Sequence, residues 1–159
     1  MKKIKKIVLV GHNISGSYII ASEIIKQFND IEFQLVITQG IYYNKTFFQS
    51  IAKLLKEASF LFVAWRAIEL LRFKLSGKGL KKLAQENNFI HFTTNDINSK
   101  ETLSRIRSFE PDLLVSCYTM HIYKSEILKI AKYNSITAHP SKIPSYRGLE
   151  VFFWQIANN

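Results

Sequence analysis

Cysteine, proline, glycine and acidic residues are all scarce in this sequence of 159 residues. The one cysteine, Cys117, excludes an internal disulfide and favours a reducing compartment. It lies in an apolar run, which predicts a buried thiol rather than a nucleophile. The three prolines and six glycines form no low-complexity tract. Since no repeat and no linker is visible either, the chain of residues 1–159 is predicted to be a single domain.

The shortage of acidic residues makes the chain basic. Twelve Asp and Glu stand against 22 Lys and Arg, which gives a net charge of +10. The lysines are spread along the chain, apart from a short cluster within residues 2–6, and no arginine-rich or aromatic-basic tract points to nucleic acid. Two interpretations stay open: a basic composition without a specific role, or an anionic partner such as tRNA, a nucleotide-linked sugar or a folate carboxylate.

Long hydrophobic runs are also missing. Residues 7–10 are four apolar residues before polar Gly-His-Asn, too few for a secretory signal, so a cytoplasmic protein is expected. The most apolar stretch, residues 58–71, contains Arg66 and Glu69 and is too short and too charged to span a bilayer. We predict a buried helix there, with an interfacial membrane helix or a docking face for a partner as the alternatives.

What is present is a regular alternation of strand and helix patterns. Continuous apolar runs such as 113–117 are typical of strands buried on both faces, and apolar residues three or four positions apart predict the helices between them. This alternation predicts an α/β fold with a doubly wound, mostly parallel, Rossmann-like sheet. The strands are expected at 7–10, 33–37, 89–92, 113–117 and 135–138, and the helices at 14–28, 42–75, 80–87, 99–110, 125–132 and 149–156.

Ligands of open α/β sheets gather at the carboxyl ends of the strands, and three such ends are polar here. They are residues 11–16, 118–121 and 137–141. The first lacks the G-x-G-x-x-G spacing, so a dinucleotide site is only weakly supported. Asn13 and Ser15 could bind an anion at the start of the first helix or simply cap that helix.

The loop that begins at His139 is the most informative segment. It reads His-Pro-Ser-Lys-Ile-Pro-Ser-Tyr-Arg-Gly, and its two prolines restrict the backbone on either side of Lys-Ile. A rigid loop presenting His, Ser, Tyr and Arg at a strand end suits a polar ligand. A strand-end histidine taken alone, however, is structural more often than catalytic.

The block from Ile136 to Gly148, preceded by Pro111-Asp112-Leu113-Leu114-Val115, resembles the formyltransferase domain. That domain occurs in methionyl-tRNA formyltransferase, glycinamide ribonucleotide formyltransferase and the sugar N-formyltransferases. The specific resemblance covers about residues 89–155. Residues 42–79 are longer than the family's core and are therefore predicted to be a helical insertion.

The resemblance implies transfer of a formyl group from 10-formyltetrahydrofolate to an amine, which could be that of methionyl-tRNA or of an amino sugar. In the family an asparagine and a histidine stabilise the negative charge that develops on the formyl oxygen, and the histidine also manages the amine proton. By resemblance His139 takes the histidine role and Thr137 stands at the asparagine position. The resemblance further implies folate contacts at the end of the fourth strand, from Tyr118, Thr119 and Met120, with an ordinary strand-end loop as the alternative, and we expect Ser141 and Ile143 to join them. Arg147 could pair with a carboxylate or phosphate or simply brace the loop, and together with Asn13 and Gly148 it is our candidate for substrate contact.

Two departures from the family pattern raise an alternative. Thr137 replaces the asparagine, and the family's aspartate, a few dozen residues beyond the histidine, has no counterpart after Glu150. We therefore expect the C-terminal part of the domain to be missing. The alternative is a catalytically impaired or vestigial folate- or nucleotide-binding domain, and an unrelated Rossmann-like nucleotide binder is a third interpretation. No Cys/His/Asp cluster predicts a metal site.

Overall fold

A computed structural model describes residues 3–39, 47–57, 59–119 and 121–139, together with the single positions 145 and 156. Five strands alternate with helices along this part of the chain. In chain order the elements are β1 (Lys6–His12), α1 (Ser15–Gln27), β2 (Glu32–Thr38), α2 (Phe47–Glu57), α3 (Phe60–Leu75), α4 (Leu80–Glu86), β3 (Ile90–Thr94), α5 (Lys100–Phe109), β4 (Leu113–Cys117), α6 (Ser125–Leu128) and β5 (Asn134–Ala138).

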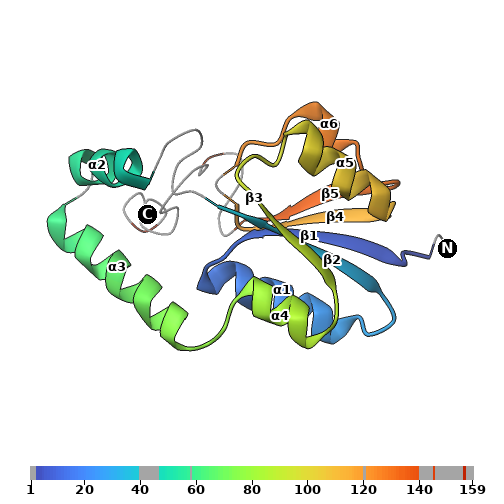
Figure 1. The fold of residues 1–159 in the computed structure, drawn as a ribbon, viewed down its shortest axis with the longest axis horizontal. Coiled ribbons are helices and arrows are strands. Elements are labelled where there is room, and N and C mark those ends of the chain that lie inside the picture. The colour runs from blue at the N-terminus through green and yellow to red at the C-terminus, as the bar shows by residue number, and fades with distance from the viewer. Residues whose placement is uncertain are drawn as a thin grey trace.

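The strands form one parallel sheet in the order β3-β2-β1-β4-β5 (Figure 1). The chain builds outward from β1 to β3 and then returns to the other side of β1 for β4 and β5. Each connection is a crossover, because parallel neighbours cannot be joined by a hairpin. The prediction of a doubly wound, parallel, Rossmann-like sheet is confirmed.

Helices cover both faces of this sheet, and a separate hydrophobic core fills each face (Figure 1). Along β1, Ile7 and Leu9 point to the side of α1 and α4, whereas Val8 and Val10 point to the side of α5 and α6. Successive side chains of a strand alternate between the faces, so a strand covered on both sides must be apolar throughout. This is why the apolar runs of the sequence identified the central strands.

Most predicted elements are found within a few residues of their expected limits. The helix after Asn98 is capped as expected, since the Ser99 side chain accepts a hydrogen bond from the Thr102 N–H at 3.2 Å. Cys117 is buried, as predicted, and burial raises the pKa of its thiol to about 12. The helix expected over 125–132 is wrong in length: α6 ends at Leu128, and the Lys132 N–H instead donates to the Pro111 carbonyl at 2.9 Å.

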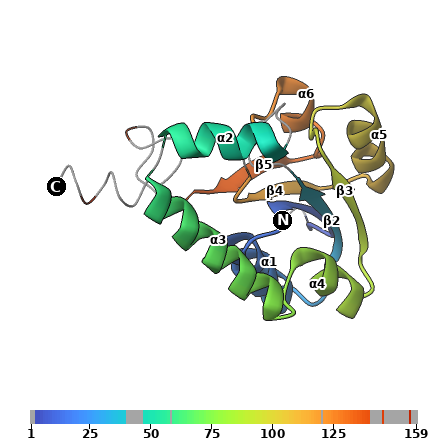
Figure 2. The same ribbon diagram turned by 60° about the vertical axis from the view of Figure 1, so that its left-hand side comes forward.

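The stretch 42–79 contains the two helices α2 and α3, and its being an insertion stays a prediction. The buried helix predicted for 58–71 is wrong. No residue of α3 is buried, and both views place α3 to one side of the sheet (Figure 2). The half-buried side of α3 carries the ion pair between Arg66 and Glu69, 2.6 Å apart. Among the described residues, no helix is long and apolar enough to cross a membrane.

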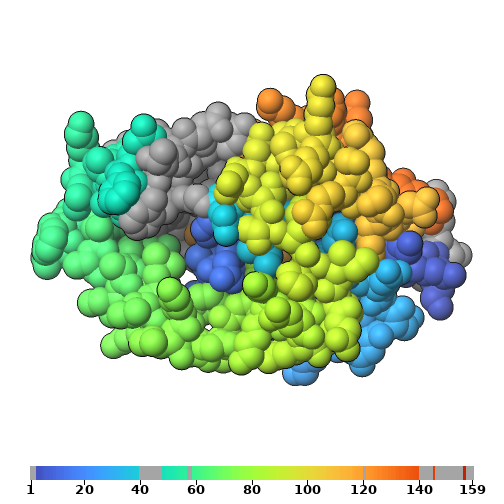
Figure 3. Space-filling model, in the orientation of Figure 1, coloured from blue at the N-terminus to red at the C-terminus, as the bar shows by residue number. Residues whose placement is uncertain are grey.

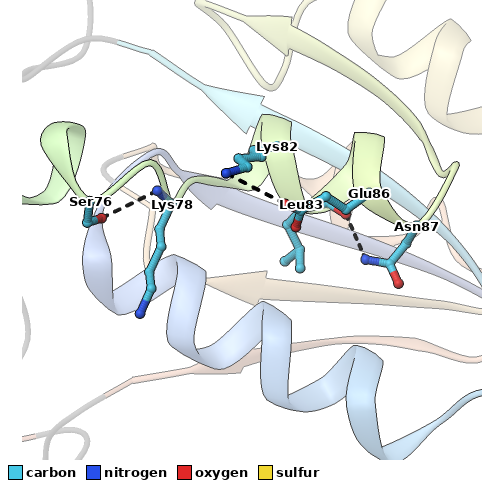
Figure 4. Close-up of polar contacts among 6 residues, drawn as sticks. All are labelled: Ser76, Lys78, Lys82, Leu83, Glu86 and Asn87. Carbon is cyan, nitrogen blue, oxygen red and sulfur yellow. Dashed lines mark hydrogen bonds and ion pairs between the residues drawn. The ribbon is translucent and has the colours of Figure 1, made fainter.

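The turn between α3 and α4 is held by local hydrogen bonds (Figure 4). The Ser76 hydroxyl donates to the Phe73 carbonyl at 2.6 Å and accepts from the Lys78 N–H at 3.3 Å. At the far end of α4 the Asn87 amide donates to the Leu83 carbonyl at 2.9 Å. The Lys78 side chain extends toward α1, where its Nζ lies 5.9 Å from the centre of the Tyr18 ring. The turn is thereby attached to α1 through a cation–π contact.

The start of β1 is tied to the start of β4 by one carboxylate. Asp112 Oδ2 accepts hydrogen bonds from the Lys5 N–H at 2.8 Å and the Lys6 N–H at 3.1 Å. The Lys5 hydrogen bond is the main reason that the pKa of Asp112 lies below its usual value, and the Lys6 N–H and the charge of Lys132 add to it. These bonds set the register in which the two central strands begin to pair.

Asp112→Asn should lower the free energy of unfolding at about pH 7 and weaken its dependence on acid. The folded-state pKa lies below the unfolded value, so the stabilisation is present above about pH 4 and is lost as the pH falls through the folded pKa. Urea unfolding at several pH values measures this. Asp30→Asn is the matched control, because Asp30 makes only an exposed 4.0 Å ion pair with Lys3. Equal acid dependence in the two variants would contradict the assignment.

Gly11 and Gly16 allow a test of how tightly β1 packs against its neighbours, because one lies in a crowded position and the other in an open one. A Cβ at Gly11 would lie 2.9 Å from Leu80 Cδ1 and 3.1 Å from both the Cys117 carbonyl oxygen and Ser17 Cβ, whereas one at Gly16 would meet nothing within 4 Å. We expect Gly11→Ala to destabilise by about 1–3 kcal/mol. Gly16→Ala, in the first turn of α1, should be neutral or stabilise by about 0.5–1 kcal/mol. Thermal unfolding of both variants tests the contrast.

Candidate functional site

The order of the strands reverses between β1 and β4, and this is where an open α/β sheet opens a crevice at its carboxyl edge. Gly11 of β1 is the register partner of Cys117 in β4, and Cys117 is in turn the partner of Ala138 in β5. The residues that follow these partners therefore emerge at one edge of the sheet. This brings together the three polar strand ends that the sequence predicted, namely those after β1, β4 and β5.

Tyr118, directly after β4, has a left-handed backbone with φ of 62°. Residues with a side chain rarely adopt this conformation, and it persists only where the surroundings enforce it. Here the Tyr118 carbonyl accepts hydrogen bonds from the His12 N–H at 3.3 Å and from the Ser17 hydroxyl at 3.1 Å. Two partners from β1 and α1 thus hold the turn that redirects the chain from β4 into the residue 118–121 segment.

Two histidines face the same edge of the sheet. Thr38 Oγ1 lies 3.3 Å from the Gly11 carbonyl oxygen and 3.5 Å from His12 Nδ1, and His121 Nε2 lies 3.3 Å from the Gln39 carbonyl oxygen. Burial lowers the pKa of His12 below its usual value, His121 lowers it further, and a hydrogen bond with Thr38 opposes part of the change. His12 is therefore neutral at about pH 7, a form that can both donate and accept a hydrogen bond.

Thr137 and His139 lie at the end of β5, which stands at one end of the described sheet. Thr137 is exposed and is the register partner of Ser116 in β4, while His139 is half-buried. Tyr123 lies close to Ser116. Burial raises the pKa of the Tyr123 phenol to about 12, and polar interactions with the side chains of Ser116 and Thr119 oppose part of that rise. The Tyr123 phenol is therefore protonated at neutral pH.

The predicted folate contacts Tyr118 and Thr119 are half-buried at the end of β4, next to the strand that carries Thr137 and His139. Asn13 does not cap the first helix, because α1 begins at Ser15 with no side-chain cap. Its Oδ1 instead accepts the Leu80 N–H at 3.0 Å and so satisfies the start of α4. Met120, Ser141, Ile143, Arg147 and Gly148 lie outside the described residues, as does the helix expected over 149–156, apart from Ile156.

Sequence reasoning placed His12 and His121 in polar strand ends but did not join them with Thr38 into one cluster. Each residue follows or ends an apolar run, but the three lie far apart in the chain and share no recognisable spacing. They meet because β2 and β4 both pair with β1. The usable signal would have been the strand order, which places the ends of these three strands side by side.

A shallow hollow of about 330 Å³ lies between the start of α1 and the second half of α3. Its lining includes Ser15, Tyr18, Arg72, Phe73 and Lys78, with the Tyr18 and Phe73 rings edge to face at 6.2 Å between centres. Within the described residues, no group of three His, Cys, Asp or Glu side chains is placed to hold a metal ion.

The amino-acid sequence matches formyltransferases of more than one kind. It is 36% identical over 80 residues to a GDP-perosamine N-formyltransferase of Brucella melitensis, a match that covers 50% of this chain and 30% of that protein. It is also 36% identical over 85 residues to a methionyl-tRNA formyltransferase of Clostridioides difficile, covering 54% of this chain and 28% of that protein. The matched segments thus span under a third of these relatives. No family model matches the chain.

Solved structures share the fold over almost the whole chain. Glycinamide ribonucleotide transformylase 1 from Geobacillus kaustophilus superposes with a TM-score of 0.54 at 14% identity, covering 99% of this chain and 69% of that one. The enzyme of the same name from Symbiobacterium toebii gives a TM-score of 0.55 at 11% identity, covering 98% of this chain and 61% of that one. The sequence matches, over about half of the chain, and the shared fold confirm the resemblance to the formyltransferase N-terminal domain family.

Proposed function

We propose that this chain carries the formyl-transfer site of an enzyme that moves a formyl group from 10-formyltetrahydrofolate to an amine. The observation that supports it is the placement of Thr137 and His139 at the end of β5, beside Tyr118 and Thr119 at the end of β4. The sequence matches to formyltransferases that act on different acceptors support the reaction class. The crevice where the strand order reverses is the expected place for the ligand.

The described residues fit a folate donor in chemical character. Tyr118 and Thr119 are half-buried at the end of β4, and the left-handed turn at Tyr118 redirects the backbone just past the strand. The Thr137 hydroxyl is exposed at the neighbouring strand end, where it can meet a ligand. When bound, 10-formyltetrahydrofolate supplies the formyl group as the electrophile.

The chain's own residues then have two tasks at the reacting atoms. Thr137 donates a hydrogen bond from its hydroxyl to the formyl oxygen, where negative charge develops as the amine attacks. His139 accepts the proton that leaves the amine nitrogen, a general-base role that histidine side chains commonly take. A hydroxyl is a shorter donor than the carboxamide of the family pattern, so we expect catalysis by Thr137 to be slow rather than absent.

The acceptor is an amine on an anionic molecule, with methionyl-tRNA and a nucleotide-linked amino sugar as the two candidates. The net charge of +10 favours an anionic partner without choosing between them. Two relatives with different acceptors in their names match the chain equally well, at 36% identity. Assays with both acceptors are therefore needed.

His139→Ala should lower kcat by roughly a hundredfold or more, because it removes the group that takes the amine proton. Binding of 5,10-dideazatetrahydrofolate, an analogue that lacks N10 and so carries no transferable formyl group, should change little and is measured by titration calorimetry. Turnover is followed as tetrahydrofolate release with each acceptor. His91→Ala is the control, because His91 lies in β3, at the far end of the sheet. Failure of the wild-type chain to bind the analogue would sink the proposal.

Thr137→Asn tests the role of residue 137 and the alternative of an impaired domain. A carboxamide restores the family's oxyanion donor, so kcat should rise by up to about a hundredfold. Equal turnover of wild type and variant would show that Thr137 does not impair the site and would contradict the impaired-domain alternative. A wild-type chain that binds the analogue without turning over, and gains activity as Thr137→Asn, would favour the impaired-domain alternative.

A further inference from the structure

The outward side of α3 is apolar along its whole length, which is unusual for a helix on the surface of a protein. Its exposed large side chains are Phe60, Leu61, Trp65, Ile68, Leu70, Leu71 and Leu75, with exposed fractions from 44% to 79%. Leu61, Trp65, Ile68 and Leu75 are spaced four, three and seven residues apart, which places them on one face of a helix. We call the stripe formed by Phe60, Leu61, Trp65, Ile68, Leu71 and Leu75 the outward face.

The inward side of α3 is already occupied. Phe73 packs edge to face on Tyr18, and the Arg66–Glu69 ion pair lies on the half-buried side. The orientation of the helix is therefore set by contacts that leave the outward face exposed. In the space-filling view α3 forms a projecting flank of the molecule, at the left of this face (Figure 3). A contiguous apolar patch of this kind marks an interaction surface.

The charges around the outward face are positive. Arg72 and Lys74 are exposed on α3. With 3.6 residues per turn they lie on the two sides of the C-terminal half of the stripe, although Arg72 is in line with Leu61 and Trp65 of the N-terminal half. Lys78 is exposed just after the helix, beside Arg72 in the lining of the hollow. The acidic residue within α3, Glu69, is engaged by Arg66. A partner that covers this face must therefore offer both an apolar interior and negative charge at its rim.

We propose that the outward face of α3 binds an anionic lipid surface, with the helix lying in the plane of the interface. Leu61, Trp65 and Ile68 enter the acyl boundary, while Arg72, Lys74 and Lys78 contact the headgroup phosphates. Amphipathic helices that combine Trp, Phe and Leu on one side with flanking cations bind membranes in this way. The proposal is independent of the formyl-transfer chemistry, since it uses no residue of the strand ends.

Charge also favours a lipid surface over a second copy of the chain as the partner of the outward face. Pairing two outward faces would bring together two molecules that each carry a net charge of +10 and whose exposed cations Arg72, Lys74 and Lys78 border the face. Like charges placed opposite each other oppose such an interface. An anionic bilayer instead attracts each flanking cation by about 1 kcal/mol.

The test is sedimentation of the 159-residue chain with sucrose-loaded vesicles of phosphatidylcholine containing about one-third phosphatidylglycerol. The triple variant Leu61→Ser, Trp65→Ser, Ile68→Ser removes apolar area and keeps every charge. We expect its affinity to fall about tenfold or more, since each side chain loses burial in the bilayer. The control Ile122→Ser removes an equally exposed apolar side chain, 81% accessible, from outside α3 and should bind as wild type does.

A charge-matched pair tests the cations. Arg72→Gln with Lys74→Gln should weaken vesicle binding several-fold, whereas Lys100→Gln with Lys129→Gln, two exposed lysines on α5 and after α6, should weaken it much less. In a Trp154→Phe background Trp65 is the sole tryptophan, because the chain has two, and its emission should shift to the blue on vesicle binding. Each of these results supports the proposal.

Three results would overturn it. Unchanged binding by the triple serine variant would show that net charge alone adsorbs the chain. A dimer in sedimentation velocity that the triple variant abolishes, without vesicle binding by wild type, would assign the face to a second copy. A lower unfolding temperature of the triple variant, again without vesicle binding, would show that the face is covered within the chain itself.

Discussion

The Tyr118 carbonyl accepts hydrogen bonds from the His12 N–H and the Ser17 hydroxyl, and this small junction joins β4 to β1 and α1 at the carboxyl edge of the sheet. Gly11 makes the close approach possible, because a Cβ there would lie 3.1 Å from the Cys117 carbonyl oxygen. The junction holds Tyr118 in a left-handed conformation and so directs the chain away from β4. The site depends on it, since the ends of β4 and β5 keep their places only while β4 stays paired with β1.

The same edge combines a rigid framework with polar groups at the strand ends. The cores on both faces hold the strands, while the residues just past the strand ends are free of the ladder and can carry polar groups. Near this edge burial keeps the Cys117 thiol and the Tyr123 phenol protonated and lowers the pKa of His12. The groups left for chemistry at neutral pH are therefore imidazoles and hydroxyls, which matches proton transfer and hydrogen-bond donation to a developing oxyanion.

The helical stretch formed by α2 and α3 differs from the sheet in how little α3 packs against a hydrophobic core. Its residues are helical by local pattern, but α3 meets the rest of the domain mainly through Phe73 and the hollow beside Tyr18. A helix that contributes no buried residue to a core gains little stability from the fold that carries it. The apolar outward face of α3 therefore adds little to folding stability. Its proposed role is binding, because an anionic lipid surface would engage both its apolar side chains and the positive charge beside them.

Local pattern alone determined a good part of this molecule. Apolar runs identified β1, β2 and β4, the Ser99 cap located α5, and the His-Pro-Ser block pointed to the family, because strand propensity, capping and motif chemistry are all encoded within a few residues. The strand order, the meeting of His12, Thr38 and His121, and the use of Asn13 to begin α4 were decided by tertiary structure. So was the exposure of α3, whose apolar pattern is the same in a buried helix and in one that faces outward. Periodicity shows which side chains share a face, but what that face meets depends on contacts between residues far apart in the chain.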